Sequence, residues 1–186
     1  MTDTTARIES STELVHQALD FGFSHAAMLD PSGLRVREEV REMCAADRCH
    51  SYNRSWACPP ACGELDDHRA ILKTYRAGLI VQTTGELEDP YDYDTMMALG
   101  ELQKRRFQGF RTILAPSYPR LLALGNGGCT ICPDCTYPDM PCRHPDQAVQ
   151  SMEAFGLVVS DVCTANQLGY YYGPNTLTYT GCYLLD

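Results

Sequence analysis

The sequence predicts a mixed α/β (α+β) fold: a single domain over 1–186 with one central sheet, flanking helices and two cysteine-rich loops. A length of 186 residues suits one domain, and no internal repeat or Pro/Ser-rich linker divides the chain. Apolar runs of strand length alternate with segments of helical periodicity, which indicates about four or five strands among about five or six helices. Ten cysteines are present, and most of them fall in two short segments.

The first half of the chain opens with a helix signal. Ser10 and Glu13 form a capping box, in which each side chain can bond a free backbone N–H at the start of a helix, and Gly22 supplies a stop. The elements expected here are helices over 13–21 and 65–77 and strands over 23–29 and 79–84. A further short helix is expected to place four side chains on one face: Val36, Val40, Met43 and Cys44.

The second half begins with a long helix, which we expect Asp94 to cap and which must end before Pro116. Its run of Lys104, Arg105 and Arg106 is either a solvated face or a docking patch for an acidic partner. The elements expected after this helix are strands over 121–124, 157–159 and 176–185 and helices over 146–155 and 161–168.

The charge balance restricts the possible partners. A formal net charge of −9 disfavours nucleic acid and favours a redox partner protein with a basic docking patch. No apolar run reaches membrane-spanning length and the first residues lack signal-peptide features, so we expect a cytoplasmic protein with no membrane association. Without an export signal, ten cysteines indicate metal chemistry rather than a disulfide framework.

The most informative segment is 125–145, which contains Cys129, Cys132, Cys135 and Cys142 in the spacing C-x2-C-x2-C-x6-C. Three thiols within seven residues cannot pair well as disulfides, but they can converge on one inorganic core. Ferredoxins use a C-x2-C-x2-C run to hold cubane iron–sulfur clusters, whereas zinc sites usually separate two cysteine pairs by a dozen or more residues. The spacing therefore favours a [4Fe-4S] cluster over structural zinc.

The residues beside these cysteines are candidate cofactor-binding residues. Gly127 and Gly128 let the backbone approach a cluster and aim N–H groups at its sulfurs, although an ordinary turn also uses glycines. Arg143 and His144 directly follow Cys142 and can hydrogen-bond cluster sulfur or steady the loop. A purely structural cap is an equally good interpretation of Arg143.

A second cysteine group lies earlier in the chain, at Cys44, Cys49, Cys58 and Cys62. Pro59 and Pro60 forbid a helix between the last two thiols and stiffen the loop. Trp56 can shield a metal centre from water, or it can be a plain core residue. Two further cysteines fall outside both groups, and we expect them to be small buried hydrophobic side chains: Cys163 and Cys182.

Three segments together resemble a family of cysteine-rich predicted metal-binding proteins of unknown function, common in anaerobic bacteria and archaea. The segments are C-x4-C…YNRSWACPP (44–60), GGCTICPDC…CRHP (127–145) and SMEAFGLVV (151–159). The resemblance extends over nearly the whole chain and implies iron–sulfur binding, but no particular reaction. Because the family's first group has three regular cysteines, Cys62 departs from the pattern, and the fourth ligand of that site stays open.

Three functions are compatible with these observations. The first is electron transfer through one or two [4Fe-4S] clusters to a redox partner. The second is an enzyme in which one cluster has an iron without a cysteine ligand, so that a small molecule binds there. The third is a zinc-stabilised binding module. Ligation by Cys62 would close the first cluster and suit electron transfer, whereas an open iron would suit the enzyme.

Overall fold

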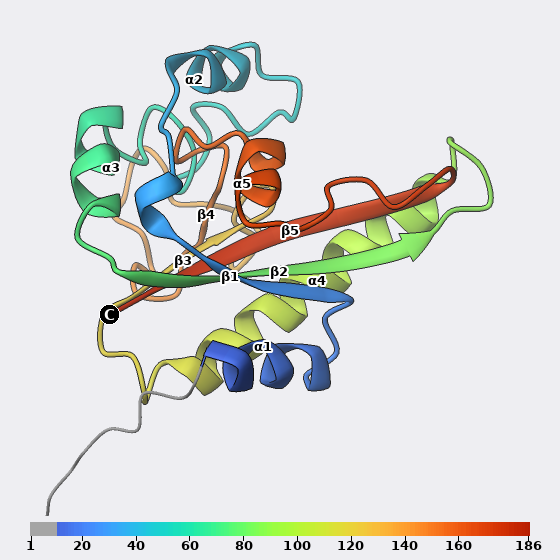
Figure 1. The fold of residues 1–186 in the computed structure, drawn as a ribbon. Helices are drawn as coiled ribbons and strands as arrows, with labels where there is room; N and C mark the ends of the chain where they lie inside the picture. Colours follow the sequence, from blue (N-terminus) through green and yellow to red (C-terminus); the bar gives the residue numbers. More distant parts are fainter. Residues whose placement is uncertain (1–10) are drawn as a thin grey trace, which may run out of the picture.

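The structure is a computed structural model that describes residues 11–186, so the predicted cap at Ser10 lies outside the described residues. One five-stranded sheet, in the order β1-β2-β5-β3-β4, runs through the described part of the chain (Figure 1). Its strands are β1 (His25–Leu29), β2 (Ala77–Glu86), β3 (Leu121–Gly125), β4 (Gln150–Ser151) and β5 (Thr176–Leu185). The helices are α1 (Ser11–Asp20), α2 (Glu38–Ala45), α3 (Leu65–Leu72), α4 (Tyr93–Leu114) and α5 (Val159–Ala165). This confirms the mixed α/β fold with one central sheet.

The centre of the sheet is the long antiparallel pair of β2 and β5, which runs from Ala77 opposite Leu185 to Glu86 opposite Thr176. β1 pairs antiparallel with β2, and β3 pairs antiparallel with β5. Because side chains alternate along a strand, neighbouring residues of β2 enter different cores. Leu79 and Ile80 illustrate this alternation, because they belong to the cores on opposite faces.

Each face of the sheet has its own hydrophobic core. α1 and α4 cover one face, where Leu14, Phe110 and Tyr183 pack together, and the Tyr183 hydroxyl donates to the carbonyl of Phe107 at 2.7 Å. α2, α3, α5 and the cysteine-rich segments lie on the other side (Figure 1). The core there contains Leu124 of β3, so the strand that leads into the main cysteine loop is anchored at its end.

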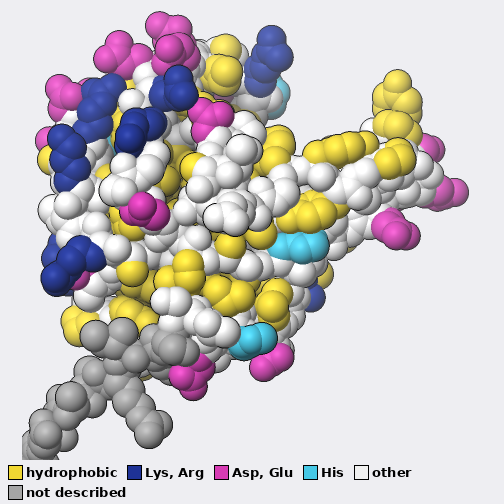
Figure 2. Space-filling model, in the orientation of Figure 1, with side chains coloured by type: hydrophobic (Ala, Val, Ile, Leu, Met, Phe, Trp, Pro, Cys, Tyr) yellow, Lys and Arg dark blue, Asp and Glu magenta, His cyan; other side chains and the backbone are white. Residues whose placement is uncertain are grey.

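The far end of the β2–β5 pair projects from the body as a ribbon, with α4 running behind it in this view (Figure 1). Hydrophobic and acidic side chains gather at its tip, whereas Lys and Arg lie mainly over the end of the molecule that carries α2 and α3, interspersed there with Asp and Glu (Figure 2). Tyr91 at the tip is 89% exposed. No helix in the described part of the chain has both the length and the apolar character needed to cross a bilayer.

The prediction of a helix over 146–155 is wrong. Gln150–Ser151 instead form β4, which pairs in parallel with Leu124–Gly125 of β3. The backbone N–H of Met152 continues this contact by donating to the carbonyl of Gly125 at 3.1 Å. The apolar spacing in this segment suits a helix, but the exposed edge of β3 offers backbone groups that must be paired, and this pairing determines the outcome.

Two helix boundaries also differ from expectation. α3 ends at Leu72, so the predicted helix over 65–77 is too long. The cap of α4 is Asp92 rather than Asp94, since the Asp92 carboxylate accepts the N–H of Thr95 at 3.1 Å. Both aspartates are suitable caps by residue type, and the turn that precedes the helix selects between them.

The remaining differences concern short segments. The strand expected over 157–159 is only an isolated bridge between Leu157 and Val36, after which the chain enters α5. That helix begins and ends earlier than the predicted 161–168. On α2, Val40 is buried as expected, whereas Met43 is 69% exposed and does not share its face.

Candidate metal centre

Each cysteine group lies on a loop that a regular element positions. β3 ends at Gly125 and releases the chain into the loop over 126–149, and α2 ends at Ala45 and releases it into the loop over 46–64. All ten cysteines lie within the described residues, and each is a free thiol. Cys163 and Cys182, outside the two groups, are fully buried in the core, as expected.

The two cysteine loops pack directly on each other, which their separation in sequence does not reveal. The Trp56 indole N–H donates to the carbonyl of Met140 at 3.0 Å, and its ring meets the Tyr137 ring edge-on at a centroid distance of 4.9 Å. The Tyr137 hydroxyl donates to the side-chain oxygen of Asn53 at 2.6 Å. Trp56 is therefore a half-buried bridge between the loops rather than a core residue.

The four thiols of the later group line one small cavity of about 30 Å³: Cys129, Cys132, Cys135 and Cys142. The other loop closes this cavity with Ser55, Trp56 and Ala57. Arg143 and His144 line it as well, and their predicted contact with a bound cluster stays a prediction. The cavity is thus built by both loops, and sequence spacing predicts only one of them.

Hydrogen bonds prepare the sulfur of Cys135 to carry negative charge. Cys135 is exposed, and the slight desolvation of its thiol raises the pKa. Hydrogen bonds from the backbone N–H groups of Tyr137, Trp56 and Thr136 and from the Ser55 hydroxyl outweigh this effect and lower the pKa. Two of these donors, Trp56 and Ser55, come from the other loop. Hydrogen bonds to a thiolate favour its charged form, and the thiolate is the form that binds metal.

The earlier group is more buried and electrostatically crowded. Burial and then the thiolates of Cys49, Cys62, Cys44 and Cys129 raise the pKa of Cys58 to about 12. Burial and Cys49 likewise raise the pKa of Cys44. Thiols that hold their protons this strongly can be deprotonated together only if a cation or cluster offsets their mutual repulsion.

The loop of Cys129 lies beside the loop of Cys58: Trp56 of the latter donates to Met140 of the former, and Cys129 contributes to the raised pKa of Cys58. Gly128 lies beside the same loop, because a Cβ added there would sit 3.2 Å from the Ser51 hydroxyl. Gly127 has a φ of +63°, a left-handed conformation that favours glycine. The glycines therefore permit the turn by which the Cys129 loop approaches the Cys58 loop.

Cys62 differs from the other members of its group. Burial raises its pKa and the Arg41 guanidinium opposes this, and its thiol donates to the carbonyl of Ala154 at 3.6 Å. Its own carbonyl accepts hydrogen bonds from the His68 ring at 3.0 Å and the Gln150 amide at 3.1 Å. The backbone at Cys62 is thus held firmly, while its sulfur points toward a backbone oxygen.

Arg41 and His68 are site residues that sequence analysis missed. Arg41 donates to the carbonyls of Gly63 and Ala154, at 3.1–3.2 Å, and so fastens the loop after Cys62. His68 is 2% exposed, stacks on Phe155 at 3.8 Å, and burial lowers its pKa. Arg41 lies three residues before Cys44 on α2, a helical spacing that could have pointed to it; nothing in the sequence singles out His68.

Arg143 steadies its own loop, since its guanidinium donates to the carbonyl of Asp134 at 3.0 Å. This supports the loop-fastening interpretation of Arg143, which the sequence left open. The carbonyl of His144 accepts the N–H groups of Gln147 and Ala148 in a turn.

The donor set is rich in soft thiols, the ligands that select zinc, copper(I) and iron–sulfur clusters. Among the described residues, no group of three or more His, Cys, Asp or Glu side chains is arranged to hold a single metal ion. One zinc ion would need its sulfurs about 3.8 Å apart, from a Zn–S bond of about 2.3 Å and tetrahedral geometry.

Comparison with known proteins gives one match. Residues 27–185 match the model of a family described as predicted metal-binding protein (DUF2284). No curated protein and no solved structure matches the chain. The matched region contains both cysteine groups and all five strands of the sheet except the first two residues of β1. Since the match spans most of its length, the chain belongs to this family of predicted metal-binding proteins.

Proposed function

We propose that the protein is an iron–sulfur protein that holds up to two [4Fe-4S] clusters and transfers electrons to a redox partner. One cluster would be held by Cys129, Cys132, Cys135 and Cys142, and the other by Cys44, Cys49, Cys58 and Cys62. The observation that carries the proposal is the packing of the two cysteine loops, in which Ser55, Trp56 and Ala57 of one loop close the cavity lined by the four thiols of the other. Neighbouring redox centres can exchange electrons, whereas structural zinc gains nothing from such proximity.

When bound, a cluster of this type supplies one-electron redox chemistry. The chain's own residues provide its surroundings. N–H groups from both loops stabilise the Cys135 thiolate, and Trp56 covers the cavity against water. We place the protein in the cytoplasm and in anaerobic metabolism, with a partner whose basic patch complements the net charge of −9.

The enzyme remains a second candidate because of Cys62. Its thiol donates to the carbonyl of Ala154, and the related family pattern has only three regular cysteines in this group. If Cys62 does not ligate, one iron keeps an open position for a small molecule. A zinc-stabilised binding module is the third candidate, because soft thiols also select zinc.

The deciding experiment is anaerobic purification with iron, sulfide and zinc quantified, followed by EPR of the reduced protein. Cys132→Ala should lose one cluster's worth of iron and be less stable, because ligation free energy is also folding free energy. Cys163→Ala is the matched control, since this buried thiol lies outside both groups. Colourless wild-type protein with stoichiometric zinc and no sulfide would refute both iron–sulfur candidates.

A further inference from the structure

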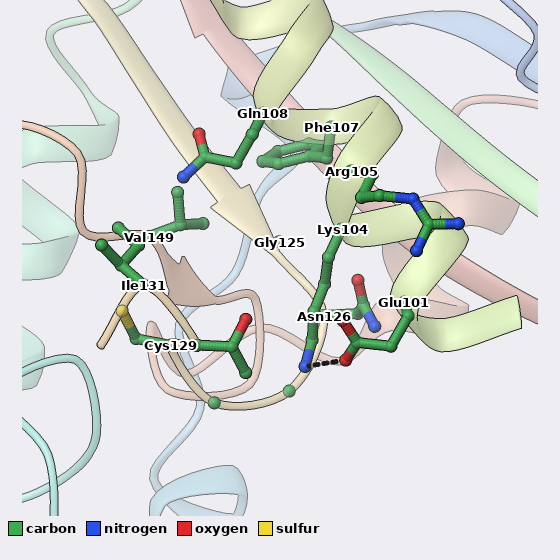
Figure 3. A pocket seen from close by; sticks show the side chains of 13 residues that line it. Glu101, Lys104, Arg105, Phe107, Gln108, Gly125, Asn126, Cys129, Ile131 and Val149 are labelled. Atoms are coloured by element: carbon green, nitrogen blue, oxygen red, sulfur yellow. Dashed lines mark hydrogen bonds and ion pairs between the residues drawn. The ribbon is translucent and has the colours of Figure 1, made fainter. Parts of the chain in front are cut away.

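A separate cavity of about 310 Å³ lies between α4 and the loop that follows β3 (Figure 3). Phe107 and Val149 give it an apolar lining, and Gly125 lies between them at the end of the strand. Cys129 and Ile131 line both this cavity and the small thiol cavity, so they form the partition between the two. A molecule in the larger cavity would therefore lie against a candidate cluster ligand.

The rim of the cavity is basic, in contrast to the acidic chain as a whole. Lys104 and Arg105 line it from α4. Lys104 pairs with Glu101 at 3.3 Å, and both side chains are partly exposed, so solvent weakens this pair. Arg105 makes no ion pair with any described residue. Lys104 and Arg105 carry two positive charges and Glu101 carries one negative charge, so the rim has a net positive charge that favours an anion.

The loop side of the cavity offers polar backbone and one unpaired acceptor. The side-chain oxygen of Asn126 is buried and has no hydrogen-bond partner among the described residues. Next to it, a Cβ added at Gly127 would meet nothing within 4 Å, so the space beside this turn is open.

We propose that this cavity binds a small organic carboxylate with a flat apolar body. The carboxylate pairs with Lys104 while Arg105 adds positive charge at the rim, and the body packs against Phe107 and Val149 beside Cys129. The volume is at the lower end of the range for small-molecule sites, about 300–1,000 Å³, which suits a ligand no larger than a substituted aromatic acid. The claim that the cavity binds a carboxylate does not depend on the proposed function. Only a reaction of the bound molecule at a cluster would rest on it.

Three probes test this assignment by NMR titration of the purified full-length chain. Benzoate has both the charge and the apolar body, acetate lacks the body, and benzamide lacks the charge. Benzoate should bind at least fivefold more tightly than either of the others and shift the backbone signals of 125–131 and of α4 around Lys104. Equal affinity for benzoate and benzamide, or shifts confined to other parts of the chain, would overturn the proposal.

A charge-matched pair of variants locates the site. Lys104→Met with Arg105→Met keeps the side-chain stems and should weaken benzoate binding at least fivefold. Lys73→Met with Arg76→Met removes the same charge from the exposed α3–β2 region and should leave binding unchanged. If both double variants weaken benzoate equally, the effect is one of net charge alone and the cavity is not the site.

The same samples separate this inference from the proposed function when iron and sulfide are measured. Benzoate binding to protein that contains neither would support the cavity and count against the clusters. In protein that contains clusters, benzoate should also alter the EPR signal of the centre that Cys129 ligates. Clusters without selective benzoate binding would leave the proposed function standing and refute the carboxylate site.

Discussion

Arg41 fastens the loop that follows Cys62, and its removal should lower the stability of the protein by a predictable amount. Its guanidinium donates to the carbonyl of Gly63 at 3.1 and 3.2 Å and to that of Ala154 at 3.2 Å. Arg41→Met keeps the apolar stem but leaves both carbonyls without a charged donor. At about 1.5 kcal/mol for each charge-assisted hydrogen bond, taken once per carbonyl, the free energy of unfolding should fall by about 3 kcal/mol.

The matched control lies one turn earlier in the chain. Arg37 pairs with Asp161 at 2.9 Å, but their side chains are 48% and 54% exposed. An exposed pair of this kind contributes about 0.2–1 kcal/mol, so Arg37→Met should lower stability only slightly. Urea unfolding of the anaerobically purified proteins, followed by circular dichroism, measures both losses on the same scale.

Arg41 should also affect metal content. Burial raises the pKa of Cys44 and of Cys62, and the positive charge of Arg41 partly offsets this rise, so its removal makes both thiols harder to deprotonate. Because metal binds the thiolate, Arg41→Met should lose iron from the earlier group and keep that of the later group. Unfolding free energies of the Arg41 and Arg37 variants within about 0.5 kcal/mol of each other, with equal iron, would refute this reasoning.

Three further predictions follow from the same contacts. Cys62→Ala should remove iron and change the EPR spectrum if Cys62 is a ligand; full iron with an unaltered spectrum would make it a bystander and favour the enzyme. Trp56→Ala should open the thiol cavity and speed bleaching of the centre by oxygen several-fold, whereas Trp56→Phe should not; equal bleaching rates would show that Trp56 shields nothing. The His25 ring stacks on Tyr172 at 3.9 Å, and burial lowers the pKa of His25 below 6.5. Because the folded protein favours the neutral ring, the contribution of His25 to stability is present above pH 6.5 and falls as the pH drops below that value. NMR titration should show this pKa returning toward 6.5 in Tyr172→Ala, and an unchanged value would contradict the assignment.

Much of the fold could be predicted from local patterns. Apolar and polar residues alternate over 176–185, and an apolar run covers 79–84. These two patterns identify the central strands, because successive side chains of a strand point to opposite faces of the sheet and the apolar ones face a core. The long helix before Pro116 is likewise visible, since proline ends a helix whatever surrounds it. Such rules act between residues a few positions apart, so the sequence alone is sufficient to apply them.

The spacing of the cysteines also determined which thiols group together. Cys129, Cys132, Cys135 and Cys142 line one cavity, as their pattern indicated. What they bind stays a prediction, because the family match supports metal binding without naming the metal.

Only the tertiary structure decided how the loops meet. The segment over 146–155 has helical spacing, yet the free edge of β3 draws Gln150–Ser151 into the sheet. The contact between the Trp56 loop and the Tyr137 loop, and the role of Arg41, depend on residues more than twenty positions apart. Short-range periodicity carries no information about such pairs, because they are selected by which backbone groups remain unpaired and which surfaces remain uncovered once the sheet has formed.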